Sequence, residues 1–323
     1  MLPIKLAHPL LCIFYSVLFR GCVGIRRSSI PESDVDLLEF PLNLEYLEAE
    51  FFLWGSLGYG LDKVAPNLTG KGPAPVGARI GKLDPLTRDV IQQFAFQEVG
   101  HLRAIKSTVK GFARPLLNLS AEAFGSVMDS AFGKPLRPSF DPYASGLNYL
   151  LASYVVPYVG LTGYVGANPK LRSPRSRKVR GFTTYKSQLF SRLKFKCNDF
   201  FAGLLGVESG QDAVIRALLY ERARKKVSPY GISVAEFTHR ISELRNKLGS
   251  AGLKDEGLVV RKERGPEGKM GGNVLTGDQM SLAFDRTPEE ILRIVYGSGN
   301  ESVPGGFYPK GGDGRIAKSH LNK

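Results

Sequence analysis

Cysteine is scarce in this chain of 323 residues, which contains three. Cys12 and Cys22 lie in an N-terminal segment that we expect to be removed, so Cys197 would stand alone. A lone cysteine excludes an internal disulfide framework and a cysteine-rich metal site. Histidine is also scarce, with four residues, and their positions suggest no Ser-His-Asp or Cys-His catalytic arrangement.

The sequence also lacks a solenoid-length repeat and a clear β-strand pattern. It does not lack apolar residues, which make up 43% of the chain. A chain of this composition can bury a core, so a hydrophilic disordered protectant is excluded. The net charge is +14, and residues 170–200 alone supply nine of these charges, with ten Lys or Arg and the single acid Asp199.

The first 24 residues are typical of a signal peptide. Lys5 precedes an apolar stretch from Leu10 to Phe19, and small residues follow at 21–24. The alternative is a buried or disordered N-terminal segment. If the chain is secreted, its three Asn-x-Ser/Thr sequons predict glycosylation at Asn67, Asn118 and Asn300.

Helical periodicity and capping signals predict an all-α bundle of four long helices within residues 33–225. The expected helices cover residues 37–53, 85–109, 147–165 and 201–225, with a shorter helix at 120–132. Residues 226–323 are predicted to form a C-terminal extension, rich in glycine and loops, with helices at 233–248 and 287–296.

Residues 142–169 carry no charge and are long enough to span a membrane. Pro157, several tyrosines and four glycines favour a buried helix of a soluble bundle instead. We therefore expect no transmembrane span.

Carboxylates occupy the centre of apolar helix faces. Glu45 lies among Leu38, Leu42, Ala49 and Phe52, and Glu98 and His101 lie among Phe94, Leu102 and Ile105. Glu208 lies near Leu204 and Ile215, with Gln211 one turn later. Buried lone carboxylates must be protonated or paired, so three of them on three helices suggest that they meet each other or a cation.

Five segments together resemble the plant desiccation-related proteins with a ferritin-like domain: Leu44–Phe52, Phe96–Arg103, Leu147–Asn168, Gly206–Ala213 and Val303–Lys310. The resemblance implies a metal site with a carboxylate on helix one, Glu-x-x-His on helix two, a carboxylate on helix three and Glu-x-x-His on helix four.

Glu45, Glu98, His101 and Glu208 match that pattern. Gln211 stands where the second histidine is expected, and helix three has no acid, only Tyr154 and Tyr158 as inward polar candidates. A complete di-iron site is therefore not expected. Two interpretations stay open: a single divalent ion such as iron or manganese, or a metal-free cluster that shares protons.

Residues 179–202 form a basic, phenylalanine-rich insertion into the resembling pattern. One interpretation is a surface that binds nucleic acid or anionic lipid. The other is a translated intron, because the residues at both ends can be encoded by codons that contain splice junctions. We favour the intron and expect no nucleic-acid partner.

The resemblance implies a secreted protein of the water-stress response, protective or structural, in the apoplast or cell wall and with cell-wall partners. The alternatives are a metal-dependent oxidoreductase of the carboxylate-bridged type and an anionic-surface binder acting through the insertion. The incomplete ligand set favours a protein that is not an enzyme.

Overall fold

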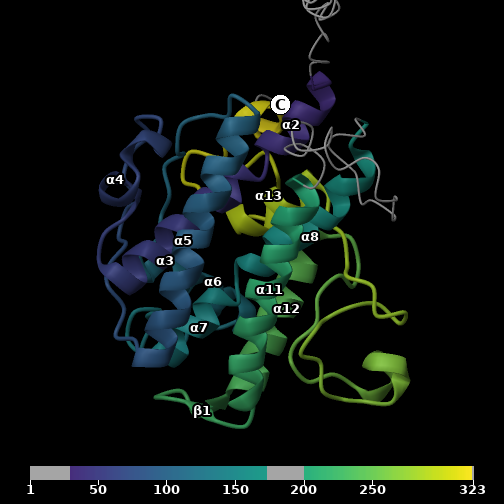
Figure 1. Ribbon diagram of the computed structural model, residues 1–323. Coiled ribbons are helices and arrows are strands. Elements are labelled where there is room, and N and C mark those ends of the chain that lie inside the picture. Colours follow the sequence, from purple (N-terminus) through teal and green to yellow (C-terminus); the bar gives the residue numbers. More distant parts are fainter. Residues whose placement is uncertain (1–29, 173–199, 322–323) are drawn as a thin grey trace, which may run out of the picture. The chain divides into compact units, whose positions relative to one another are not determined.

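The computed structural model describes residues 30–172 and 200–321, and these form a mainly helical protein, as predicted. The bundle consists of α3 (Leu42–Leu57), α5 (Pro85–Thr108), the broken pair α7 (Gly146–Ser153) and α8 (Pro157–Ala167), and α11 (Phe200–Glu221). Helix α3 packs along α5, and α8 packs along α11 (Figure 1). The expected signal peptide and most of the basic insertion lie outside the described residues.

Smaller elements surround the bundle. They are α2 (Glu32–Glu39), α4 (Leu61–Val64), α6 (Ala121–Phe132), α12 (Val234–Gly249), α13 (Pro288–Tyr296), α14 (Gly314–Leu321) and the hairpin of β1 (Lys226–Val227) and β2 (Ile232–Ser233). Short 3₁₀ segments occupy Pro66–Leu68, Asn168–Lys170, Lys262–Arg264 and Pro266–Gly268.

The predicted helix starts are confirmed where a side chain caps the helix. Asp84 accepts a hydrogen bond from the Thr87 amide before Pro85, and Ser120 and Ser233 cap α6 and α12 in the same way. Thr287 forms a full capping box with Glu290. These signals are local, because an Ncap oxygen satisfies an amide only three residues away.

Two expected helices are broken in the structure. The first ends at Glu39 and restarts at Leu42, because Pro41 has no amide hydrogen to continue the α2 ladder. The third breaks after Ser153 and restarts at Pro157, which occupies the first position of α8.

Two further expectations are corrected. Besides the two helices expected in the extension, the structure has a third, α14, which buries His320 to 6% exposure. Two short strands exist where none was expected.

The stretch Gly146–Lys170 is long and apolar enough to cross a membrane by length and composition. Within the protein, 83% of its hydrophobic window is buried. This burial is what a core helix of a bundle shows, and it agrees with the interpretation favoured from the sequence.

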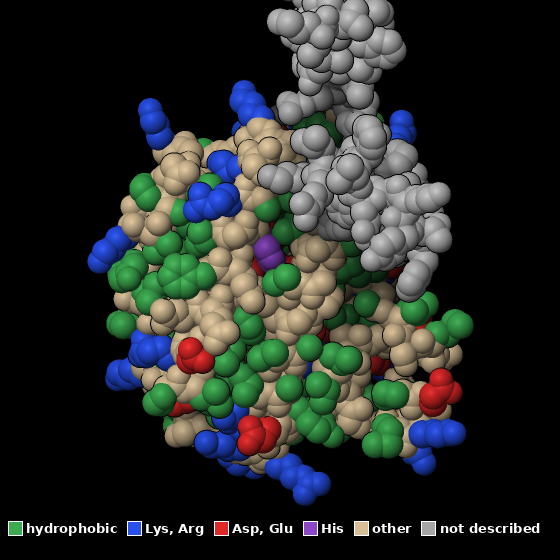
Figure 2. Space-filling model, viewed as in Figure 1, with side chains coloured by type: hydrophobic (Ala, Val, Ile, Leu, Met, Phe, Trp, Pro, Cys, Tyr) green, Lys and Arg blue, Asp and Glu red, His purple; other side chains and the backbone are tan. Residues whose placement is uncertain are grey.

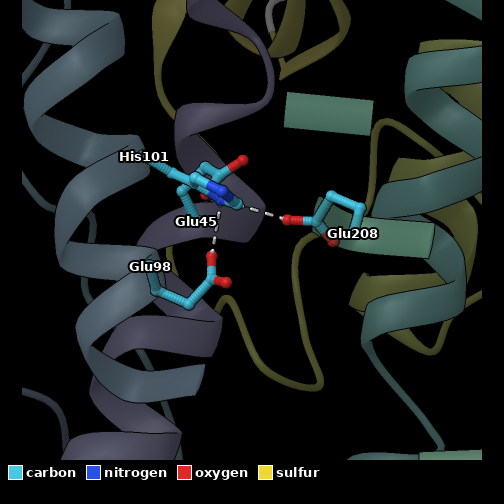
Figure 3. A group of neighbouring side chains, drawn as sticks. All are labelled: Glu45, Glu98, His101 and Glu208. Atoms are coloured by element: carbon cyan, nitrogen blue, oxygen red, sulfur yellow. Dashed lines mark hydrogen bonds and ion pairs between the residues drawn. The ribbon is translucent and has the colours of Figure 1, made fainter. Parts of the chain in front are cut away.

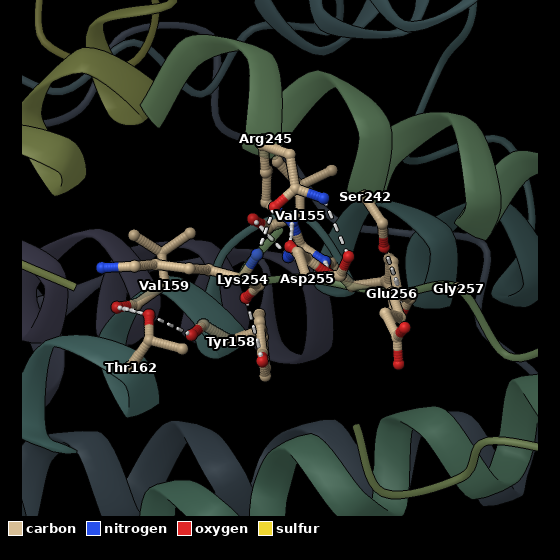
Figure 4. Close-up of polar contacts among 12 residues, drawn as sticks. Val155, Tyr158, Val159, Thr162, Ser242, Arg245, Lys254, Asp255, Glu256 and Gly257 are labelled. Atoms are coloured by element: carbon tan, nitrogen blue, oxygen red, sulfur yellow. Dashed lines mark hydrogen bonds and ion pairs between the residues drawn. The ribbon is translucent and has the colours of Figure 1, made fainter. Parts of the chain in front are cut away.

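A buried polar network ties the C-terminal extension to the third helix (Figure 4). Arg245 on α12 forms an ion pair with Asp255 at 2.6 Å and donates to the carbonyl of Tyr154 at 2.6 Å. The Tyr158 hydroxyl donates to the carbonyl of Lys254 at 3.2 Å. Because these groups are buried and paired, the extension packs as part of the same folded unit.

Candidate metal centre

Three helices bring the predicted site residues together. Helix α3 carries Glu45, α5 carries Glu98 and His101 three residues apart, and α11 carries Glu208 and Gln211 three residues apart. Residues three apart lie on one face of a helix, so each pair points to the same side. All five side chains are buried, and Gln211 donates a short hydrogen bond to Glu98, so the predicted set converges in the bundle core.

One imidazole nitrogen lies at the centre of the group (Figure 3). His101 Nδ1 is 3.0 Å from Glu45 Oε2, 3.3 Å from Glu98 Oε2 and 3.4 Å from Glu208 Oε1. A ring nitrogen can donate only one proton, so at most one of the three oxygens receives a full hydrogen bond from it. The ligand-type atoms of these four residues all lie within 4.8 Å of one another.

A fourth buried carboxylate, which the sequence analysis missed, lies beside this group. Glu48 on α3 is 1% exposed, and it follows Glu45 by three residues on the same face. Neither of its oxygens has a hydrogen-bond partner among the described residues. The spacing Glu45-x-x-Glu48 was a signal in the sequence, but only one carboxylate was sought on that helix.

The third helix contributes a different tyrosine from those proposed. The Tyr164 hydroxyl on α8 donates a short hydrogen bond to Glu45 Oε1. Tyr154 and Tyr158 instead face the extension, where the Tyr154 hydroxyl contacts Ser242 at 2.9 Å. The prediction that these two tyrosines point toward the carboxylates was therefore wrong.

Burial and mutual repulsion set the protonation of the carboxyl groups. Burial, followed by the charges of Glu208 and other carboxylates, raises the pKa of Glu48 and of Glu98 well above the usual range. Burial raises the pKa of Glu208 to about 7, although His101 partly opposes it.

Glu45 and His101 form the charged pair of the group. Burial alone would raise the pKa of Glu45, but the charge of His101 and its hydrogen bond outweigh that effect and lower it. Burial alone would lower the pKa of His101, but Glu45 and Glu98 raise it. In the absence of other cations, the imidazolium compensates one carboxylate, and burial and repulsion favour the protonated forms of Glu48 and Glu98.

A divalent cation fits this set of donor atoms. Several buried oxygens have no hydrogen-bond partner among the described residues: both of Glu48, one of Glu98, both of Glu208 and the amide oxygen of Gln211. Carboxylate and amide oxygens with one imidazole are ligands suited to manganese or iron. Such an ion would satisfy these buried acceptors, which no described donor meets.

The site is nearly closed to solvent. The side chain of His101 keeps 9% of its surface exposed, against 2% or less for the three carboxylates. Figure 2 shows a histidine with acidic side chains behind it in a hollow at the centre of the front face.

The remaining predicted residues lie away from the centre. Asn67 and Asn300 are exposed and Asn118 is half-buried, so their glycosylation stays a prediction. His239 is 47% exposed beside Glu243, as expected for a solvated residue.

Comparisons with known proteins agree with this architecture. The chain matches the family model of the ferritin-like domain over residues 33–183. It is 59% identical over 289 residues to desiccation-related protein PCC13-62 of Craterostigma plantagineum, covering 90% of this chain and 86% of that protein.

It is also 55% identical over 294 residues to ferritin-like catalase Nec2 of Nesocodon mauritianus, covering 91% of this chain and 88% of that protein. No solved structure gives a significant match. With the four-helix arrangement and the Glu45, Glu98-x-x-His101 and Glu208 pattern, these matches identify the chain as a member of the family of ferritin-like desiccation-related proteins.

Proposed function

We propose that this protein is a secreted water-stress protein that binds a redox-active divalent ion, manganese or iron, and disproportionates hydrogen peroxide. The observation that supports it is the convergence of three buried carboxylates on His101 Nδ1, with buried oxygens that no described donor meets. A relative at 55% identity over most of both chains is named a ferritin-like catalase.

Glu45, Glu98, His101 and Glu208 would hold the ion, and Gln211 would border it. A bound manganese or iron ion would supply the change of oxidation state that peroxide disproportionation needs. In the overall reaction two molecules of peroxide give one of oxygen and two of water. Two electrons and two protons leave one peroxide and are taken up by the other, so no further reductant or oxidant is required.

The chain's own residues would hold and orient the site. Without an ion, burial raises the pKa of Glu208 to about 7; a bound cation would favour its charged form, so Glu208 would act as a ligand. Glu45 holds the His101 ring through Nδ1 at 3.0 Å, and Tyr164 in turn holds Glu45.

The test combines metal content with oxygen release. Protein purified without chelator after growth with manganese and iron is expected to contain metal and to evolve oxygen from peroxide. His101→Gln is expected to lower the rate about 100-fold or more and to lose metal, whereas His239→Gln, an exposed histidine on α12, retains both. Elemental mass spectrometry and an oxygen electrode measure the two quantities.

Metal-free wild-type protein, or equal oxygen release from both variants, would contradict the proposal. The second candidate function would then stand: a protective or structural protein of the apoplast or cell wall. The raised pKa values of Glu48 and Glu98 support that candidate, because protonated carboxyl groups allow the site to fold without metal.

Secretion is tested separately. Protein isolated from apoplastic fluid is expected to begin near residue 25 and to lose mass on treatment with a glycosidase that releases N-linked glycans. An intact N-terminus, together with a cytosolic location, would contradict secretion.

A further inference from the structure

Helix α8 carries no carboxylate toward the site, and Gly160 occupies the place where one would be. A Cβ atom at Gly160 would lie 3.3 Å from Glu48 Oε1 and 3.3 Å from Glu208 Oε2. Glu48 Oε1 and Glu208 Oε2 are therefore separated by no more than twice 3.3 Å. Because Gly160 has no side chain, Glu48 from α3 and Glu208 from α11 reach into the space beside it.

Glu50, two residues after Glu48 on α3, shows how this chain buries a carboxylate for structural purposes. It is 0% exposed, forms a short ion pair with Arg114 and accepts the Leu61 amide at 3.3 Å. Glu48 is equally buried, but among the described residues it has no such partner. A charged carboxylate buried without a partner costs several kcal/mol. Glu48 must therefore hold a proton when no cation is present, whereas a cation beside it would pair its charge.

Glu208 presents its two oxygens to two different neighbours. Oε1 lies 3.4 Å from His101 Nδ1, and Oε2 borders the Gly160 position together with Glu48. A carboxylate in this arrangement can bridge two cations, as the facing glutamates of bundle metal sites do.

We propose that Glu48 is a metal ligand which, with Glu208 and Glu98, holds a second divalent cation beside the ion at Glu45 and His101. The carboxylate missing from the third helix is thus replaced from α3, three residues after Glu45. This inference rests on the proposed function, since it requires that the first ion binds. It revises the sequence argument against a complete site, which considered only the third helix as the source of that carboxylate.

The test counts ions rather than turnover. Wild-type protein is titrated with Mn²⁺ while electron paramagnetic resonance is recorded, and bound metal is measured by elemental mass spectrometry after gel filtration. We expect two Mn per chain, with the signal of isolated Mn²⁺ giving way to a spin-coupled signal as the second equivalent binds. Glu48→Gln is expected to lose one equivalent and the spin coupling.

Asp212→Asn is the matched control. Asp212 is a buried carboxylate on α11 whose charged partners are Arg216 and Arg245, so the variant is expected to retain two ions. Thermal unfolding of each variant checks that it is folded, and the wild-type titration needs no variant at all.

Each outcome separates this inference from the proposed function. Two ions in wild type and one in Glu48→Gln support it. One ion in wild type, or two in Glu48→Gln, overturns it and leaves the proposed function standing. No bound ion in wild type overturns both.

Discussion

Glu208→Gln is expected to stabilise the metal-free protein while it removes metal binding. Burial raises the pKa of Glu208 from 4.5 to about 7, so the folded state holds the proton more tightly than the unfolded state. The folded protein therefore loses stability as the pH rises from about 4.5 to about 7. Glutamine has a similar shape and cannot ionise, so it does not incur this loss.

The magnitude follows from the size of the pKa shift. A shift from 4.5 to about 7 corresponds to about 3 kcal/mol at 1.36 kcal/mol per pH unit. The free energy of unfolding of the variant should exceed that of wild type by about 3 kcal/mol above pH 7.5. Below pH 4.5, where Glu208 is protonated in both states, the two proteins should be nearly equal.

Urea unfolding of chelator-treated protein between pH 4.5 and 8 measures this difference. Glu45→Gln is expected to lower the free energy of unfolding instead. The pKa of Glu45 is lowered in the folded state, and the variant removes the main partner of the charge on His101. Metal at about 1,000 times its dissociation constant should reverse the order for Glu208→Gln, because it adds about 4.1 kcal/mol to wild type alone, which exceeds the difference of about 3 kcal/mol. A difference between Glu208→Gln and wild type that does not change with pH would refute the reasoning.

Three further predictions concern other parts of the chain. Tyr164→Phe removes the hydrogen bond to Glu45 and is expected to weaken metal affinity about 10-fold or more, measured by competition with a chelating dye. Arg114→Met leaves the buried Glu50 without its charged partner and should cost about 3–5 kcal/mol in urea unfolding, partly restored by adding Glu50→Gln. Sequenced transcripts are expected to lack the codons for residues 179–202, and transcripts that all retain them would refute the intron interpretation.

Local signals predicted the elements well where the information lies within a few residues. Asp84 before Pro85 and Thr287 before Pro288 gave helix starts that the structure confirms. The break at Pro41 was equally local, because a proline inside an apolar run removes one amide from the ladder. It was missed because the apolar residues continue on both sides of it.

The site was predicted in part because its residues follow helical spacing. Glu45, Glu98, His101 and Glu208 each lie at the centre of an apolar face, and the structure brings them within 4.8 Å of one another. Glu48 also follows that spacing, so the sequence contained the signal for it.

The choice among the tyrosines of the third helix could not be made from spacing. Tyr154 and Tyr158 are four residues apart and both face the extension, whereas Tyr164 faces Glu45, and spacing alone does not say which face of the helix points toward the site. Tyr154 contacts Ser242, which is 88 residues away in sequence. A partner at that distance follows from tertiary packing alone.

The break in the third helix explains why the extension matters to the site. Pro157 has no amide hydrogen, so it cannot donate to the carbonyl of Ser153, and the helix is interrupted there. Within the break, Arg245 donates to the carbonyls of Tyr154 at 2.6 Å and Val155 at 3.2 Å, and Asp255 neutralises its buried charge. Tyr164, which holds Glu45, lies two turns after this break on α8. A fragment that ended at residue 225 would lose both Arg245 and Asp255, so we expect the bundle alone to lose the orientation of α8 and with it the metal centre.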